Sequence, residues 1–145
     1  MKLPEYVTAK EVARVCKEIG LTDWSKRKTD VVSAKEAAKI LRIVNLEKMK
    51  IPLEDFRIGL VVELEHGTRF KDANVTNNHP LLTGKIVLAY LKETMDYYRR
   101  IDVAEIEGDL LKAILAGNLV KVKSKYKKLA EAQKALSEVV ARQLK

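Results

Sequence analysis

The apolar residues of this chain recur at intervals of three and four along almost its whole length, which is the spacing of one face of an α-helix. Two segments open with the same start signal, a hydroxyl residue followed three positions later by glutamate: Thr8 with Glu11, and Ser33 with Glu36. Strand-like alternation is confined to one short stretch inside a longer helical pattern. The predicted fold is all-α: a compact multi-helix domain with an added C-terminal helical hairpin.

At 145 residues the chain has the length of one ordinary domain, so residues 1–145 are predicted to form a single domain. Within it, residues 7–50 read as a duplicated pair of capped helices. Residues 53–100 read as a core helix pair joined by a long polar loop, 68–80. Residues 102–145 are predicted to form a basic helical hairpin.

Proline and glycine suggest where several of these helices begin and end. Pro52 suits the first turn of the third helix, and Gly67 is expected to terminate it. A fourth helix is expected from about Leu82 to Arg99. Asp102 proposes the start of a fifth, which would end near Gly117.

The last segment shows a heptad pattern over residues 119–144. The predicted seam consists of Leu119, Val122, Tyr126, Leu129, Gln133, Leu136 and Val140. Such a seam either packs inside one chain or joins two copies of it, so a homo-oligomer through this segment is one of the partner hypotheses.

The formal net charge of +8 is unevenly distributed. Residues 1–50 hold 12 Lys and Arg against 7 Asp and Glu (+5), residues 51–100 hold 7 against 7 (zero), and residues 101–145 hold 9 against 6 (+3). A basic surface favours polyanions, although a solvated face or a heat-adapted source would give the same composition. The candidate nucleic-acid or polyanion contacts are Lys26, Arg27, Lys28, Lys121, Lys125 and Lys128.

Glu63 and His66 stand three apart near the end of the third helix, a spacing that also occurs in bundles holding two metal ions. With Glu93 they form the alternative hypothesis of a metal-binding helical protein. The favoured interpretation assigns no metal and no cofactor: Glu63 and His66 would organise the adjacent loop through hydrogen bonds. The remaining residues of this loop-organising motif are Asn74, Asn77 and Thr83.

Nothing in the sequence supports catalysis, since it contains neither a glycine-rich nucleotide fingerprint nor a Ser/His/Asp or Cys/His set. The single cysteine, Cys16, lies on an apolar helical face and is expected to be inert core. No run of about 18 apolar residues is present, so no membrane association is expected and the chain is predicted to be cytoplasmic.

Four short motifs carry a resemblance to a known family. They are the segment from Phe56 to Gly67 ending in Glu-Leu-Glu-His-Gly, Asn74-Val75-Thr76-Asn77, Thr83-Gly84-Lys85-Ile86 and Asp96-Tyr97-Tyr98. With them the chain resembles a small domain family of unknown function that is found in archaea, bacteria, phages and large DNA viruses. The resemblance implies a shared fold and no established activity.

Together these observations predict a non-catalytic helical binding or structural protein of archaeal or viral type. Its basic helices would dock on nucleic acid or on a nucleoprotein assembly. Metal binding and self-association through the heptad remain the two alternatives.

Overall fold

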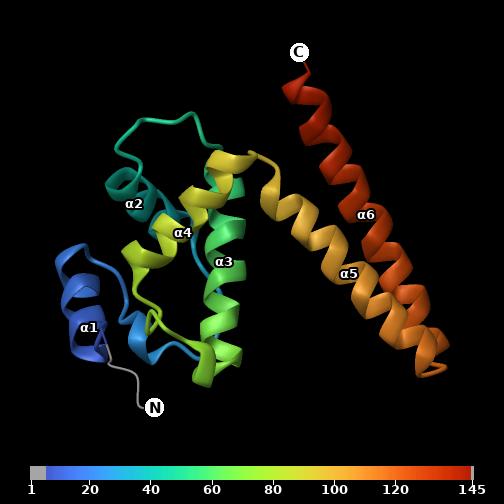
Figure 1. Cartoon of the computed structure of the whole chain (residues 1–145), viewed down its shortest axis with the longest axis horizontal. Coiled ribbons are helices and arrows are strands. Elements are labelled where there is room, and N and C mark those ends of the chain that lie inside the picture. The colour runs from blue at the N-terminus through green and yellow to red at the C-terminus, as the bar shows by residue number, and fades with distance from the viewer. Residues whose placement is uncertain (1–5, 145) are drawn as a thin grey trace. The chain divides into compact units, whose positions relative to one another are not determined.

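The computed structural model describes residues 6–144, which contain six α-helices and two short 3₁₀ turns and no strand (Figure 1). The all-α prediction is therefore confirmed. The chain divides into two compact units, Met1–Met95 and Asp96–Lys145. The second unit thus begins a few residues before position 102, where the sequence pattern placed the hairpin.

From residue 6 onward, the first unit contains four helices. Within it α2, α3 and α4 each contact the other two, and α1 contacts α4. The elements are α1 (Ala9–Glu18), η1 (Trp24–Lys26), α2 (Ala34–Val44), α3 (Leu53–Arg69), η2 (Lys71–Ala73) and α4 (Pro80–Glu93).

Both predicted helix starts are present at the expected residues. The Thr8 hydroxyl accepts a hydrogen bond from the backbone N–H of Glu11 (3.2 Å) at the start of α1. Ser33 and Glu36 form a complete capping box at the start of α2, because each side chain accepts from the other residue's backbone N–H. These local bonds satisfy N–H groups that a helix start leaves without a partner.

The core of the first unit is apolar and tightly packed. Its fully buried large side chains include Trp24, Ile40, Phe56, Leu60 and Leu91. The thiol of Cys16 is buried beside them and accepts from the backbone N–H of Trp24 (3.4 Å), and this burial raises the pKa of Cys16. The expectation that Cys16 belongs to the core is confirmed.

Gly67 does not end the third helix, contrary to the sequence prediction. α3 continues to Arg69, and Gly67 is buried within its last turns. A Cβ at this position would stand 2.0 Å from Asn78 Oδ1. Gly67 is therefore explained by the close approach of the following loop and not by helix termination.

The predicted fourth helix is also wrong in its extent. α4 ends at Glu93, Thr94 is extended (φ −156°), and α5 begins at Tyr97. No helix starts at Asp102, which lies inside α5. Asp96 is the N-cap residue of the new start: it is buried there without a side-chain capping bond, and its carboxylate accepts from the Arg100 guanidinium at 3.0 and 2.8 Å.

The second unit is a helical hairpin of α5 (Tyr97–Leu115) and α6 (Leu119–Gln143), which lie side by side and antiparallel (Figure 1). Gly117 adopts a positive φ of 63° in the turn between them. The Asn118 side chain caps α6 by accepting from the Lys121 N–H at 3.0 Å.

The seam through which α6 packs on α5 differs from the predicted one by a rotation of the helix. Leu129 is buried as expected, but Tyr126 and Leu119 are 56% and 80% exposed. The side chains of α6 that are buried or half-buried at heptad spacing are Val122, Lys125, Leu129, Ala132, Leu136 and Val139, here called the inner seam. No helix of residues 6–144 combines the length and apolar character needed to span a membrane.

Candidate functional site

The candidate binding surface lies on α6, where positive charge accumulates. The helix carries seven Lys and Arg residues against two acids, Glu131 and Glu138. Within residues 6–144, no ion pair joins a carboxylate to the five lysines Lys121, Lys123, Lys127, Lys128 and Lys134. By contrast, the guanidinium groups of Arg14, Arg27, Arg57 and Arg69 in the first unit are each paired with a glutamate.

Three of the predicted contacts share one side of α6. Lys121, Lys125 and Lys128 follow at intervals of four and three, so they project from neighbouring turns over about 10 Å of helix. Lys121 and Lys128 are exposed, whereas Lys125 is half-buried against α5. We call these three residues the lysine face.

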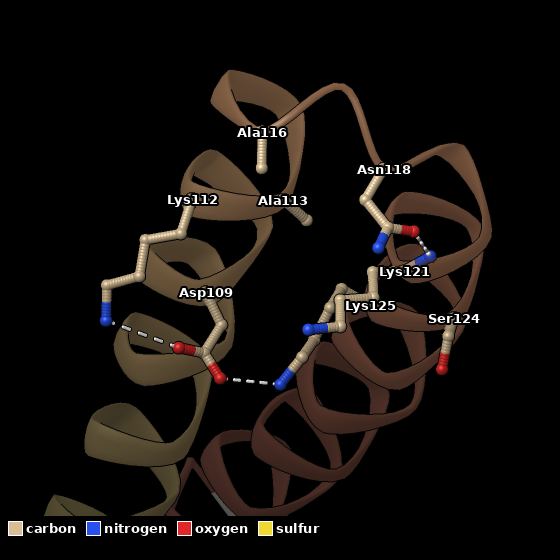
Figure 2. A pocket seen from close by; sticks show the side chains of 8 residues that line it. All are labelled: Asp109, Lys112, Ala113, Ala116, Asn118, Lys121, Ser124 and Lys125. Carbon is tan, nitrogen blue, oxygen red and sulfur yellow. Dashed lines mark hydrogen bonds and ion pairs between the residues drawn. The ribbon is translucent and has the colours of Figure 1, made fainter.

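Asp109 on α5 organises this surface (Figure 2). Its two carboxylate oxygens lie 2.5 Å from Lys125 Nζ and 3.4 Å from Lys112 Nζ. The hydrogen bond from Lys125 is the main reason why the pKa of Asp109 lies below its usual value, and Lys112 lowers it further. Asp109 thus neutralises part of the charge and holds Lys125 in place, while Lys121 is left without a carboxylate partner in the described chain.

A cleft of about 550 Å³ lies between the two helices at this point. In Figure 2 the ammonium groups of Lys112, Lys121 and Lys125 border it, with the Ser124 hydroxyl nearby. Three ammonium groups and a single carboxylate at one cleft leave a net positive surface that can receive an anionic group.

The basic segment of the first unit has a different character. The Arg27 guanidinium lies 4.7 Å from the centre of the Trp24 ring and pairs with Glu36, and its side chain is only 14% exposed. Lys26 lies 3.4 Å from Asp23, and Lys28 is exposed. The structure therefore gives Arg27 a role in holding Trp24, and leaves Lys26 and Lys28 exposed.

The loop after α3 is held together by asparagines. Asn74 Nδ2 donates to the Gly67 carbonyl (3.1 Å) and to Asn78 Oδ1 (2.9 Å), and Asn77 Nδ2 donates to the Val7 carbonyl (2.5 Å). Asn77 and Asn78 both adopt positive φ, a conformation that asparagine tolerates better than most residues. Asn74 and Asn77 thus do organise the loop, together with Asn78, which the sequence analysis did not single out.

Glu63 and His66 lie close to each other, and their role in organising this loop stays a prediction. The His66 side chain is 59% exposed, and its nearest described charged partner is Glu63, with Nδ1 and Oε2 4.0 Å apart. Thr83 is buried in the first turn of α4. Among residues 6–144 no group of three or more His, Cys, Asp or Glu side chains could hold a metal ion, so Glu63, His66 and Glu93 do not converge.

His79 is a second residue that sequence reasoning missed. It is buried at the N-terminus of α4, where its Nδ1 accepts from the backbone N–H groups of Leu81 (3.2 Å) and Leu82 (3.3 Å). Pro80 was the available signal, because a proline at the first helical position marks the residue before it as the cap.

The cap requires neutral His79, so the free energy of unfolding is expected to fall in mild acid. Burial is the main factor that lowers the pKa of His79; the charge of Arg14 lowers it further, whereas that of Glu11 raises it. The pKa of His79 is lower in the folded state than in the unfolded state. The contribution of the cap to the free energy of unfolding is therefore complete above the unfolded-state pKa of about 6.5, and it declines as the pH falls below that value.

Replacing His79 by asparagine, which also caps helices, should flatten the change in unfolding free energy between about pH 7.5 and 5.5. Denaturant titrations at each pH measure this change. The matched control is His66→Gln, which removes the only other histidine and should leave the pH dependence in place. Equal slopes for His79→Asn and the parent would contradict the assignment.

The fold and these surfaces define an all-helical protein with a basic hairpin. Residues 12–107 match the model of a family described as "Protein of unknown function (DUF5661)", and the chain belongs to that family. The resemblance to a family of unknown function is confirmed at that level. The match ends within α5, so α6 lies outside the matched range. No curated protein and no solved structure shows a significant match.

Proposed function

We propose that this protein is a non-catalytic binding protein whose hairpin attaches to nucleic acid through the lysine face of α6. The observation that carries the proposal is the excess of unpaired lysine on one helix: seven cationic residues against two acids, with five lysines lacking a carboxylate partner among residues 6–144. Lysines placed on successive turns suit the regularly spaced phosphates of a nucleic-acid backbone.

The arrangement of the lysine face favours contact with phosphates over contact with bases. Lysine is a flexible point charge, and the face offers no arginine fork of the kind that reads guanine. Tyr126 is 56% exposed but points away from the lysine face, so it supplies no stacking platform there. Binding is therefore expected to depend little on sequence and strongly on salt.

Packing and hydrogen bonds within the first unit account for several residues of the family-matched motifs. We therefore assign the binding function to the hairpin and not to these motifs. Gly67 and Asn74 hold the loop, and Gly84 admits the Ile40 side chain at a close approach. Glycine and asparagine at these positions are explained by packing and backbone conformation.

A salt titration of DNA binding tests the proposal. The logarithm of the association constant should fall linearly with the logarithm of salt concentration, with about 0.9 in slope for each phosphate neutralised. The variant Lys121→Gln/Lys125→Gln/Lys128→Gln should lose about two to three from that slope and bind at least about tenfold more weakly at low salt. Fluorescence anisotropy with a labelled duplex measures both quantities.

The matched control removes three exposed lysines of the first unit, Lys10, Lys17 and Lys35, and so lowers the net charge equally. The proposal predicts that this control keeps most of the parent's affinity and slope. A control that loses as much as the lysine-face variant, a parent that does not bind at low salt, or equal binding to poly-glutamate would contradict it.

A further inference from the structure

α6 carries a second heptad beside the inner seam. Its residues follow spacings of four and three from one end of the helix to the other and are all uncharged except Lys123. They are Leu119, Lys123, Tyr126, Ala130, Gln133, Ser137, Val140 and Leu144, here called the outer stripe. Leu119, Tyr126 and Leu144 are 80%, 56% and 83% exposed, so this stripe has no cover within the second unit.

The outer stripe lies on the side of the hairpin opposite the lysine face. The cleft residues Lys121 and Ser124 flank the inner seam on one side. Since successive residues turn by about 100°, Tyr126 and Gln133 flank it on the other side. The same rotation on α5 places the exposed side chains of Leu111 and Ile114 on the side away from Asp109. The hairpin thus has one basic side and one largely apolar side.

We propose that a second copy of this chain covers the outer stripe, with the two α6 helices antiparallel about a two-fold axis. The spacing 4-3-4-3-4-3-4 reads the same in both directions, so an axis through its centre brings every stripe position level with another. Leu119 then lies opposite Leu144 of the partner copy. Tyr126 lies opposite the small Ser137, and Ala130 opposite Gln133, so large side chains meet small ones.

A stripe of alternating charges lies next to the outer stripe. Lys127, Glu131, Lys134 and Glu138 are exposed at spacings of four, three and four, on the side away from α5. In the antiparallel dimer Lys127 comes within about 3 Å along the axis of both Glu138 and Lys134 of the partner copy, so these charges favour neither direction of pairing.

A parallel pairing would set Lys123 of the outer stripe against the same lysine of the partner copy, whereas the antiparallel pairing sets it against Val140. This position therefore favours the antiparallel arrangement.

The exposed apolar surface is sufficient for a standard small interface. Leu111, Ile114, Leu119, Tyr126, Val140 and Leu144 can each bury roughly 60–100 Å² more. Two copies would then remove about 700–1,200 Å² from water, near the ~1,000 Å² that specific interfaces reach. The lysine face remains outside the interface, so the dimer does not depend on the proposed function.

Sedimentation equilibrium of the full chain tests the dimer. The parent should approach twice 16.4 kDa as its concentration rises through about 1–100 µM. Tyr126→Glu, which puts a charge at the centre of the stripe, should remain at the mass of one chain. Ser124→Glu, the matched control on the opposite side of α6, should dimerise like the parent. Circular dichroism of each variant verifies that the helices are retained.

The two variants decide the outcome together. A parent that stays monomeric over this concentration range, or a Ser124→Glu variant that loses dimerisation as completely as Tyr126→Glu, would overturn the proposal.

Discussion

Replacing Glu36 by glutamine is expected to lower the free energy of unfolding by about 2–4 kcal/mol. The carboxylate accepts from the Trp24 indole (3.3 Å), from the Ser33 N–H (3.0 Å) and hydroxyl (2.9 Å), and from the Arg27 guanidinium. It therefore ties the connection around Trp24 to the start of α2. Glutamine removes the charge and leaves Arg27, whose side chain is 14% exposed, without its partner.

The matched control is Glu18→Gln, which breaks a surface pair with Arg14 on α1. Glu18 is 66% exposed, so its loss should cost less than about 0.5 kcal/mol. Chemical denaturation of both variants measures the difference. Equal stability of Glu36→Gln and Glu18→Gln would show that the network around Trp24 contributes little.

The same network has a pH signature. Burial acts to raise the pKa of Glu36, but hydrogen bonds from Ser33 and Trp24 and the charge of Arg27 outweigh it and hold the pKa below its usual value. The contribution of Glu36 to the free energy of unfolding is therefore present above its unfolded-state pKa of about 4.3. It is lost as the pH falls through its folded-state pKa.

The second large effect is expected at Gly84. A Cβ there would stand 2.5 Å from Ile40 Cγ2 and 3.5 Å from both Phe56 Cζ and Val44 Cγ1, and all three neighbours are buried. Ile40 and Phe56 are fully buried and have little room to withdraw. Gly84→Val should therefore lower the free energy of unfolding by about 3 kcal/mol through overpacking.

Gly108→Val supplies the matched control, because Gly108 also lies within a helix but has no atom within 4 Å of an added Cβ. Both substitutions change helix propensity alike, so their difference isolates the collision in the core. Gly108→Val should change stability by less than about 0.5 kcal/mol. Similar losses at both positions would contradict the packing at Gly84.

The starts of α1 and α2 were predictable from the sequence because their signals are local. Thr8 and Ser33 cap helices through atoms only three residues away, and Pro80 marks the cap at His79 in the same manner. The break at Thr94 was not predictable by this means. Apolar residues continue in helical phase across it, and the buried Asp96 that starts α5 resembles any other acidic residue in the sequence.

The sequence identified the loop, but not which of its side chains make the hydrogen bonds that hold it. The stretch from Asn74 to Asn78 reads as turn-forming, which is correct, but the sequence did not indicate that Asn78 accepts a hydrogen bond from Asn74 inside the loop. Which side chain reaches Gly67 depends on the path of the loop through two positive-φ residues, and periodicity carries no information about that path.

The two heptads of α6 show why the seam was misplaced. The outer stripe contains Tyr126 and Val140, whereas the inner seam contains Lys125 and Ala132, so hydrophobicity alone favours parts of the wrong face. The turn through Gly117 and the ion pair of Lys125 with Asp109 decide which face meets α5. Both depend on tertiary geometry that the spacing of residues does not contain.

The central claim is that nucleic acid binds to the lysine face of α6. The most direct test records amide chemical-shift changes of the full chain while a short DNA duplex is added at low salt. The account predicts that the largest changes fall on α6 between residues 119 and 131 and on the facing turn of α5 around Asp109, and that they vanish when salt is raised. Changes centred on the first unit, or none at saturating duplex, would contradict it.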